Sequence, residues 1–109
     1  MQQWDIFLFP FADAGPHPAV ILSSDERCSN PDLFHVNALI CTSIRVTRPL
    51  KKHEVMLDAA DGLDWETAVR CDLIHLLPKA SFGAARGKVS PARQIVIARK
   101  LAECLRLRW

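Results

Sequence analysis

Turn-forming residues interrupt the first 88 residues of the chain at short intervals, and this limits the fold more than any other feature. Prolines, glycines and pairs such as Asp-Gly separate the apolar runs, and the first of these runs, residues 4–11, is too short for a confident helix. The intervening runs are short and apolar, which is typical of strands. The expected strands cover residues 4–11, 18–24, 35–43, 53–58 and 65–77, and residues 44–47 either continue the third strand or form a short one. Residues 24–34 and 79–88 are expected to be loops, the first with room for a helical turn.

One segment near the end of the chain differs from this pattern. Ser90 is a good N-cap, and Pro91 fits the first helical position, where its missing N–H costs nothing. Apolar residues then recur at steps of three and four, which predicts an amphipathic helix over about residues 90–105. The apolar stripe consists of Ile95, Ala98, Leu101, Ala102 and Leu105.

Short connections between the strands favour antiparallel pairing. The sequence therefore predicts a mainly β protein, a small antiparallel barrel of five to seven strands with the C-terminal helix packed over it. A length of 109 residues fits one domain, 1–109, with a modest hydrophobic core.

The composition is that of a globular protein, with half of the residues hydrophobic and 24% charged. A net charge of +2 does not by itself indicate nucleic-acid binding. The position of the charge is more informative, because Arg45, Arg48, Lys51 and Lys52 cluster in the middle of the chain.

Cysteine spacing and the N-terminal sequence bear on the compartment. The four cysteines include no C-x-x-C pair, and Asp72 and His75 lack a second ligand pair, so no metal site is expected. Cys41 and Cys71 lie in apolar runs, where cysteine acts as a small hydrophobe in a reducing cytosol. The N-terminus lacks the features of a signal peptide, and no apolar run approaches the ~20 residues that span a bilayer. We expect a cytoplasmic protein with no membrane segment.

One expected strand carries the most suggestive polar side chains. Alternation along a strand places Arg70 and Asp72 on one face, with Val69, Cys71 and Leu73 on the other. Such a pair can hold a phosphate and move a proton, or it can be an ordinary surface ion pair that contributes little.

Four segments, in order, resemble the MazF/PemK/Kid family of toxin ribonucleases. They are the opening strand at residues 4–9, the Pro-Ala-Val-Ile-Leu-Ser strand within 15–23, the apolar strand ending in Thr-Ser at 36–43, and Val-Arg-Cys-Asp at 69–72, which matches the Kid branch. Residues 87–90 also resemble the family's entry into its C-terminal helix. The order and spacing of the segments, which cover nearly the whole chain, carry the resemblance rather than any single motif.

The resemblance implies an SH3-like barrel that forms a homodimer, cuts single-stranded RNA such as mRNA with no metal or other cofactor, and is inhibited by an acidic antitoxin protein. It implies catalytic roles for Asp72 and Arg70. Thr42 and Ser43 either bond a phosphate oxygen or only satisfy the backbone at the end of their strand. The basic side chains either form the flank that meets the RNA backbone or are a scattered solvated surface. They are Arg45, Arg48, Lys51, Lys52 and Lys79.

One position departs from the family pattern. The family usually has an arginine immediately before the proline of the second strand, and that arginine contributes to catalysis, whereas this chain has His17. Some Kid-branch members carry a functional histidine in the preceding loop, which is shortened here. His17 therefore either combines the roles of the arginine and of the loop histidine, or the site is catalytically impaired.

The chemistry of RNA cleavage assigns the roles. The 2′-hydroxyl attacks the neighbouring phosphate, so a base must take its proton, an acid must protonate the leaving oxygen, and a cation must stabilise the phosphorane. Asp72 is the candidate base, although an ordinary pKa of ~3.9 is low for that task without partial desolvation. Arg70 is always protonated, which suits charge stabilisation. His17 is the candidate acid, because histidine titrates near neutral pH.

Two other functions stay open. CcdB-like poisons, which trap DNA gyrase, use a similar barrel and carry a tryptophan near the C-terminus, as Trp109 is here, but they lack the Thr-Ser and V-R-C-D segments. The other alternative is a degenerate family member that only binds RNA or an antitoxin because of His17. An RNA cleavage assay in EDTA separates the ribonuclease from both.

Overall fold

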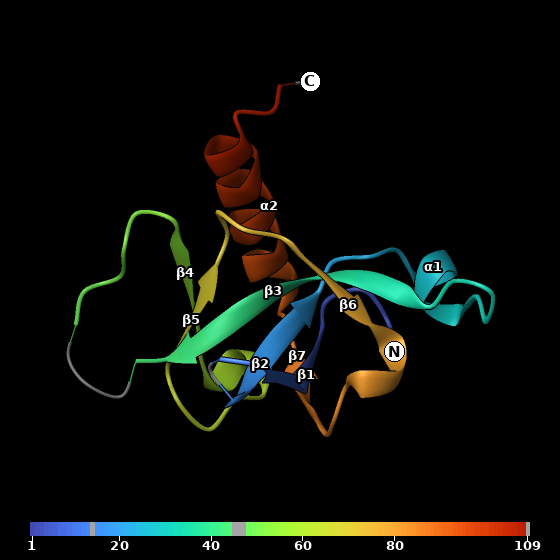
Figure 1. Cartoon of the computed structure of the whole chain (residues 1–109). Coiled ribbons are helices and arrows are strands. Elements are labelled where there is room, and N and C mark those ends of the chain that lie inside the picture. The colour runs from blue at the N-terminus through green and yellow to red at the C-terminus, as the bar shows by residue number, and fades with distance from the viewer. Residues whose placement is uncertain (14, 45–47, 109) are drawn as a thin grey trace.

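The body of the protein is an antiparallel sheet against which one long helix stands (Figure 1). The computed structural model describes residues 1–13, 15–44 and 48–108, and within these the sheet has seven strands in the order β4-β5-β3-β2-β1-β7, with β6 beside β3. The elements are β1 (Asp5–Phe11), β2 (Gly15–Ile21), α1 (Asp25–Ser29), β3 (His35–Ser43), β4 (Glu54–Leu57), η1 (Ala59–Asp61), β5 (Thr67–Arg70), β6 (His75–Pro78), η2 (Lys79–Ser81), β7 (Ala85–Lys88) and α2 (Pro91–Leu105). The sheet curls into a half-barrel, so the expected mainly β barrel with a C-terminal helix is confirmed.

β3 is the central strand, because its nine residues are enough to pair with three other strands. One edge pairs with β2, and the other edge pairs with β5 at residues 41–43 and with β6 at residues 35–38. The single strand expected over residues 65–77 is therefore wrong. It is divided into β5 and β6, which take successive halves of the same edge of β3, and the bend between them leaves Asp72 outside the ladder.

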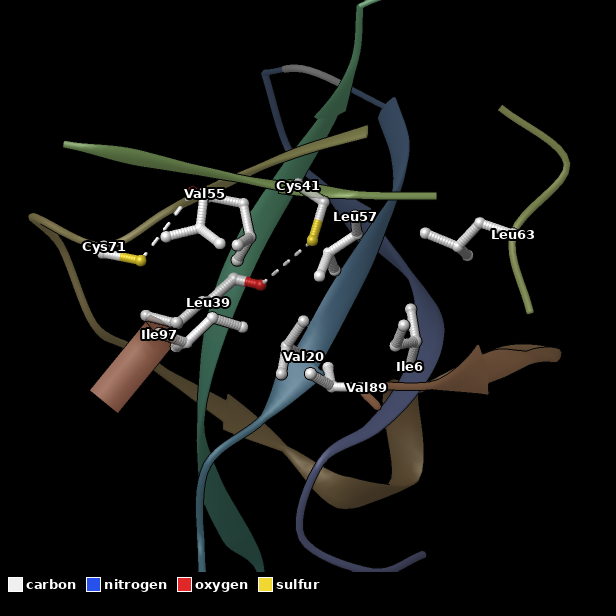
Figure 2. Packing of buried hydrophobic residues seen from close by; sticks show 11 residues of the cluster. Ile6, Val20, Leu39, Cys41, Val55, Leu57, Leu63, Cys71, Val89 and Ile97 are labelled. Atoms are coloured by element: carbon white, nitrogen blue, oxygen red, sulfur yellow. Dashed lines mark hydrogen bonds between the residues drawn. The ribbon is translucent and has the colours of Figure 1, made fainter. Parts of the chain in front are cut away.

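Both faces of the central strands are buried. Val20 faces one hydrophobic cluster, while its neighbours Ala19 and Ile21 face another, as alternation along a strand requires. The first cluster lies between the sheet and α2 and is shown in Figure 2, where it includes Ile6, Leu39, Cys41, Leu57, Val89 and Ile97. The second lies on the opposite face of β2 and β3 and includes Phe9, Val36, Ala38 and Leu77.

Helix α2 begins where the sequence predicts but packs through a face that only partly overlaps the predicted stripe. Ile97 is fully buried, and Leu101 and Cys104 pack against the first cluster. The predicted stripe is right for Leu101 and wrong for Ile95 and Leu105, which are 56% and 40% exposed. The spacing of the stripe is helical, but much of it points away from the barrel.

Contacts at the first turn of α2 account for this rotation. Ser90 is the N-cap residue, yet its hydroxyl makes no capping bond, and the buried Asp61 accepts the Ser90 N–H at 2.8 Å instead. Asp61 also accepts from Arg93 at 2.7 Å, and Arg93 donates to Asp58 at 3.0 Å. A side chain at Gly87 would collide with the Asp61 carbonyl oxygen, so glycine is required for this close approach. These contacts turn the Arg93 side of α2 toward the barrel.

The remaining expectations vary in outcome. The first two expected strands form the hairpin β1–β2, and the loop over 24–34 includes α1. The loop expected over 79–88 is wrong in its second half, where β7 pairs with β1 across a bulge at Ile6 and Phe7. Residues 45–47 of the predicted short strand, and Trp109, lie outside the described residues. In the part of the chain that the structure describes, no helix has the length and apolar character needed to cross a membrane.

Candidate active site

Arg70 and Asp72 form an ion pair with two hydrogen bonds at the end of β5. Arg70 Nε donates to Asp72 Oδ1 at 2.6 Å, and Nη2 donates to Oδ2 at 3.2 Å. Cys71 lies between them in the sequence and is buried in the first cluster, so the two charged side chains meet outside it. Both remain open to solvent, at 48% and 33% exposure. A guanidinium has five N–H donors, so three remain for a phosphate.

Hydrogen bonding, rather than burial, decides the charge state of this pair. The hydrogen bonds from Arg70 hold the pKa of Asp72 below its usual value, and desolvation opposes this with a smaller effect. The same contact raises the pKa of Arg70. Desolvation therefore does not raise the pKa of Asp72 as the candidate role requires, and the carboxylate is ionised at neutral pH.

The residue just before β4, His53, approaches the pair, and sequence analysis missed it. The β4–β5 register places Glu54 opposite Arg70, and the Cys71 N–H donates to the His53 carbonyl oxygen at 2.9 Å. His53 Nε2 consequently lies 3.9 Å from Asp72 Oδ1. The alternation of residues 53–58 predicts this strand, but only its pairing with β5 would have pointed to His53.

A second ion pair lies beside the first. Arg48 donates to both carboxylate oxygens of the buried Glu54, at 2.8 and 2.9 Å, and the Lys51 N–H donates to Oε1 at 2.8 Å. The hydrogen bonds from Arg48 are the largest cause that lowers the pKa of Glu54 to about 2. Arg48, a predicted RNA contact, thus has a structural partner that holds the segment before β4.

His17 lies on β2, across β3 from Arg70. Its ring meets Phe11 edge-on at 6.5 Å between centroids, which places it on the face of the second cluster. His17 Nδ1 is 3.1 Å from the Cys41 carbonyl oxygen, and because a carbonyl only accepts, Nδ1 is the donor of this hydrogen bond. The strands β2 and β5, which carry the two residues, lie two strand spacings apart, about 10 Å.

Thr42 lies on β3 between these two residues. The registers Ala19 with Ile40 and Thr42 with Ala68 place His17, Thr42 and Arg70 on one face of the sheet. Ser43 pairs with Thr67 and faces the other way. The structure therefore brings His17, Thr42, Arg70 and Asp72 toward one surface and does not bring Ser43 there.

The other predicted RNA contacts differ in their availability. Lys51 and Lys52 are exposed before β4. The Lys79 ammonium instead donates to the carbonyl oxygens of Arg27 and Asn30 at the end of α1. Arg45 lies outside the described residues. The basic side chains thus do not form one uniform free patch.

Comparison with known proteins identifies the family. A family model of PemK-like, MazF-like toxins of type II toxin–antitoxin systems matches residues 2–105. The chain belongs to this toxin family. The match confirms the resemblance at the level of the family and does not distinguish the Kid branch. Comparison with curated protein sequences finds no match.

Solved structures of toxins share the fold over nearly their full length. A mycobacterial endoribonuclease in complex with its cognate antitoxin has a TM-score of 0.82 and 27% identity, covering 100% of this chain and 98% of that chain. A mycobacterial endoribonuclease solved separately has a TM-score of 0.79 and 28% identity, covering 100% and 94%. The Mycobacterium tuberculosis toxin MazF-mt6, with a TM-score of 0.80 and 23% identity over 96% and 99%, shares the fold.

The cysteines of the toxin belong to its packing. Cys28, Cys41, Cys71 and Cys104 are free thiols, and burial raises the pKa of Cys71 to about 12 and that of Cys41 further. The buried Cys41 and Cys71 thiols are thus weakly acidic and act as small hydrophobes, as expected. Among the described residues, no three His, Cys, Asp or Glu side chains gather as metal ligands.

Proposed function

We propose that the protein is the endoribonuclease toxin of a toxin–antitoxin pair, that it cuts single-stranded RNA, including mRNA, without a metal ion, and that it acts in the cytoplasm as one domain, 1–109. The family supports a toxin, and relatives 27% and 28% identical are endoribonucleases. The observation that carries the proposal is the exposed Arg70–Asp72 pair, on the same side of the sheet as His17 and Thr42.

The proposed reaction is attack by the 2′-hydroxyl on the adjacent phosphodiester. The bond from the 2′-oxygen to phosphorus forms while the bond from phosphorus to the 5′-oxygen breaks, which leaves a cyclic phosphate and a 5′-hydroxyl. Asp72 accepts the 2′-proton, and protonated His17 Nε2 donates to the leaving oxygen. The separation of about 10 Å between the strands β2 and β5 leaves room for a phosphate between the side chains of His17 and Arg70.

Arg70 links substrate binding to the strength of the base. Its three remaining N–H donors contact the phosphate, where they stabilise the charge that develops on the phosphorane. As Arg70 shifts toward the phosphate, its bonds to Asp72 weaken and the pKa of Asp72 rises toward the range that a base requires. Thr42 supplies a hydroxyl donor to a phosphate oxygen from β3.

We also propose two protein partners. One relative is in complex with its cognate antitoxin, and an acidic antitoxin segment would complement Lys51 and Lys52. The second partner is another copy of the chain. Leu73, Ile74 and Leu76 follow Asp72 and are 45%, 38% and 65% exposed, so a second subunit covering them would join two sites across one interface.

RNA cleavage in the presence of EDTA tests the proposal. The wild type is expected to cut, and Asp72→Asn is expected to lose cleavage while still binding a 2′-O-methyl RNA, since the amide keeps the shape but lacks the base. Asp64→Asn, a change at an exposed acid paired with Arg86, is the matched control and keeps the rate. A wild type that cuts no RNA, with no activity restored by His17→Arg, would mean that Arg70–Asp72 is a surface ion pair on an inactive or antitoxin-binding barrel.

A further inference from the structure

A cationic pocket opens beside Asp72, next to the last turns of α2. Its volume is about 430 Å³, within the range of small-ligand sites, and its lining includes Lys52, His53, Asp72, Lys100, Glu103 and Arg106. Three segments form it: the residues before β4, the bend after β5 and the end of α2. Asp72 is the residue that the pocket shares with the proposed catalytic group.

Charge in the pocket favours an anion. Both carboxylates of the lining already have cationic partners, because Asp72 is bonded to Arg70 and Glu103 lies 3.4 Å from Lys100 Nζ. Lys52 and Arg106 are then in excess among the described lining residues. The C-terminal end of α2 contributes about half a negative charge, less than either of these two full positive charges.

The backbone of Arg106 is a second, independent observation. Arg106 follows α2 with φ 54° and ψ 39°, the left-handed conformation in which helices usually end with glycine. A non-glycine residue is disfavoured there, and such positions cluster at functional sites. The chain thus places a guanidinium at the pocket where the backbone favours a residue with no side chain.

We propose that this pocket holds the sugar and phosphate of the nucleotide next to the cleaved bond of RNA, an assignment that rests on the proposed function. An RNA strand whose reacting phosphate lies at Arg70 would pass Asp72 and His53 into the pocket, since His53 Nε2 is 3.9 Å from Asp72 Oδ1. There Arg106 and Lys52 bind the phosphate oxygens, the first through a planar fork of donors. RNA is favoured over an acidic peptide because the pocket is larger than a carboxylate needs and shares a wall with the proposed base.

Binding of a short mixed-sequence 2′-O-methyl RNA, which has no nucleophile, tests the assignment. Arg106→Gly and Lys52→Ala are each expected to reduce the slope of log affinity against log salt by about 0.7, the effect of one lost phosphate contact on a single strand. Arg106→Gly also suits the left-handed backbone, so its melting temperature should not fall. Arg99→Ala removes an exposed cation of α2 outside the pocket lining and is the matched control, with an unchanged slope. With cleavable RNA, both pocket variants are expected to raise KM and leave kcat unchanged.

The outcomes separate this inference from the proposed function. If both pocket variants bind and cut like Arg99→Ala, the pocket assignment is wrong and the ribonuclease proposal stands. If the wild type binds the 2′-O-methyl RNA through the pocket but cuts no RNA, the ribonuclease proposal fails, and the pocket is an RNA phosphate site but not the subsite beside a cleaved bond. If the variants weaken binding of poly-glutamate and leave RNA binding unchanged, the pocket serves a protein partner and the inference is overturned.

Discussion

Three carboxylates of the protein share one feature, a pKa lowered mainly by hydrogen bonds from an arginine. The pairs are Asp72 with Arg70, Glu54 with Arg48, and Asp58 with Arg93. Each carboxylate is ionised at neutral pH, so each pair favours the folded state there and ceases to do so in acid. At the scale of single residues, the arginines therefore lower the pKa of the proposed catalytic base, and they make the free energy of unfolding depend on pH in the acid range.

Glu54 gives a prediction with a defined pH window. Because its pKa falls from 4.5 to about 2, its stabilising contribution is present above pH 4.5 and is lost as the pH falls toward 2. Arg48→Ala leaves a buried carboxylate without its main partner, so we expect a stability loss at neutral pH on the order of 1–3 kcal/mol. The variant should also lose less further stability over the acid window. Urea unfolding at a series of pH values measures both effects, and parallel wild-type and Arg48→Ala curves would exclude this ion pair as the cause.

His17 is the position that decides how the site works. If His17 is the general acid, kcat/KM falls as the histidine loses its proton at rising pH, and His17→Ala removes that limb of the profile. No limb from Asp72 is expected near neutral pH, because its pKa in the free protein is lowered. A pH–rate profile measures this. A rate that rises in His17→Arg, with no limb near neutral pH in the wild type, would show that His17 only replaces an arginine.

The sequence predicted some residues of the site and not others. The spacing of Arg70 and Asp72 predicts that they meet, and they do so even though Asp72 lies outside the strand. His53 could not be found in the same way, because its approach to Asp72 depends on the register between β4 and β5, which no local pattern encodes.

At the scale of the elements, long-range partners overrode local patterns in three places. β5 and β6 are separate because β3 has room for both along one edge. β7 forms from a Gly- and Ala-rich segment because β1 supplies its hydrogen bonds. Helix α2 turns its predicted stripe partly outward because Arg93 reaches Asp58 and Asp61. Sequence periodicity predicted where α2 begins, and the tertiary contact decided which face packs.

The close approach of β7 to η1 predicts that adding one methyl group at Gly87 destabilises the fold. Gly87→Ala would drive a Cβ into the Asp61 backbone oxygen and displace the carboxylate that caps α2, so we expect a loss on the order of 1–3 kcal/mol. Gly83→Ala is the matched control, because its nearest neighbour would be the Leu8 oxygen at 3.5 Å, an ordinary contact. Thermal unfolding of the two variants measures the difference, and equal melting temperatures would contradict the close packing described here.

At the scale of the whole molecule, the fold class was predictable because the apolar runs before residue 88 are short and rich in strand-forming residues, and most of the elements there are strands. The assembly was not predictable from the same pattern, since an exposed apolar side chain becomes visible only once the fold is known. The exposed residues lie both beside Asp72 and on the outer face of α2, and they include Leu73, Leu76, Ile95 and Val96.

The proposed homodimer can be tested on that surface. Light scattering of the wild type at micromolar concentration is expected to give a dimer, and Leu76→Lys is expected to give a monomer because it places a charge beside Leu73 and Ile74. Phe34→Lys is the control. Phe34 is also exposed, at 70%, but it lies beside Lys79, at the opposite end of β6 from Leu73 and Ile74. A monomeric wild type would contradict the proposal, and a dimeric Leu76→Lys would place the interface elsewhere.

The attachment of α2 has a mechanical consequence. The helix is clamped at its first turn by the polar contacts of Asp61 and Arg93, whereas its other end, which terminates at Arg106 beside the pocket, is held to the barrel by the apolar packing of Leu101 and Cys104 (Figure 1). The helix is therefore fixed more firmly at its first turn than at its last. Amide hydrogens of the last turn should exchange with solvent first, and those held by the clamp should exchange only on global unfolding. An anion that bridges Arg106 to Lys52 would add a second attachment at this end of the helix. The last turn of α2 would therefore become more rigid when the toxin binds RNA.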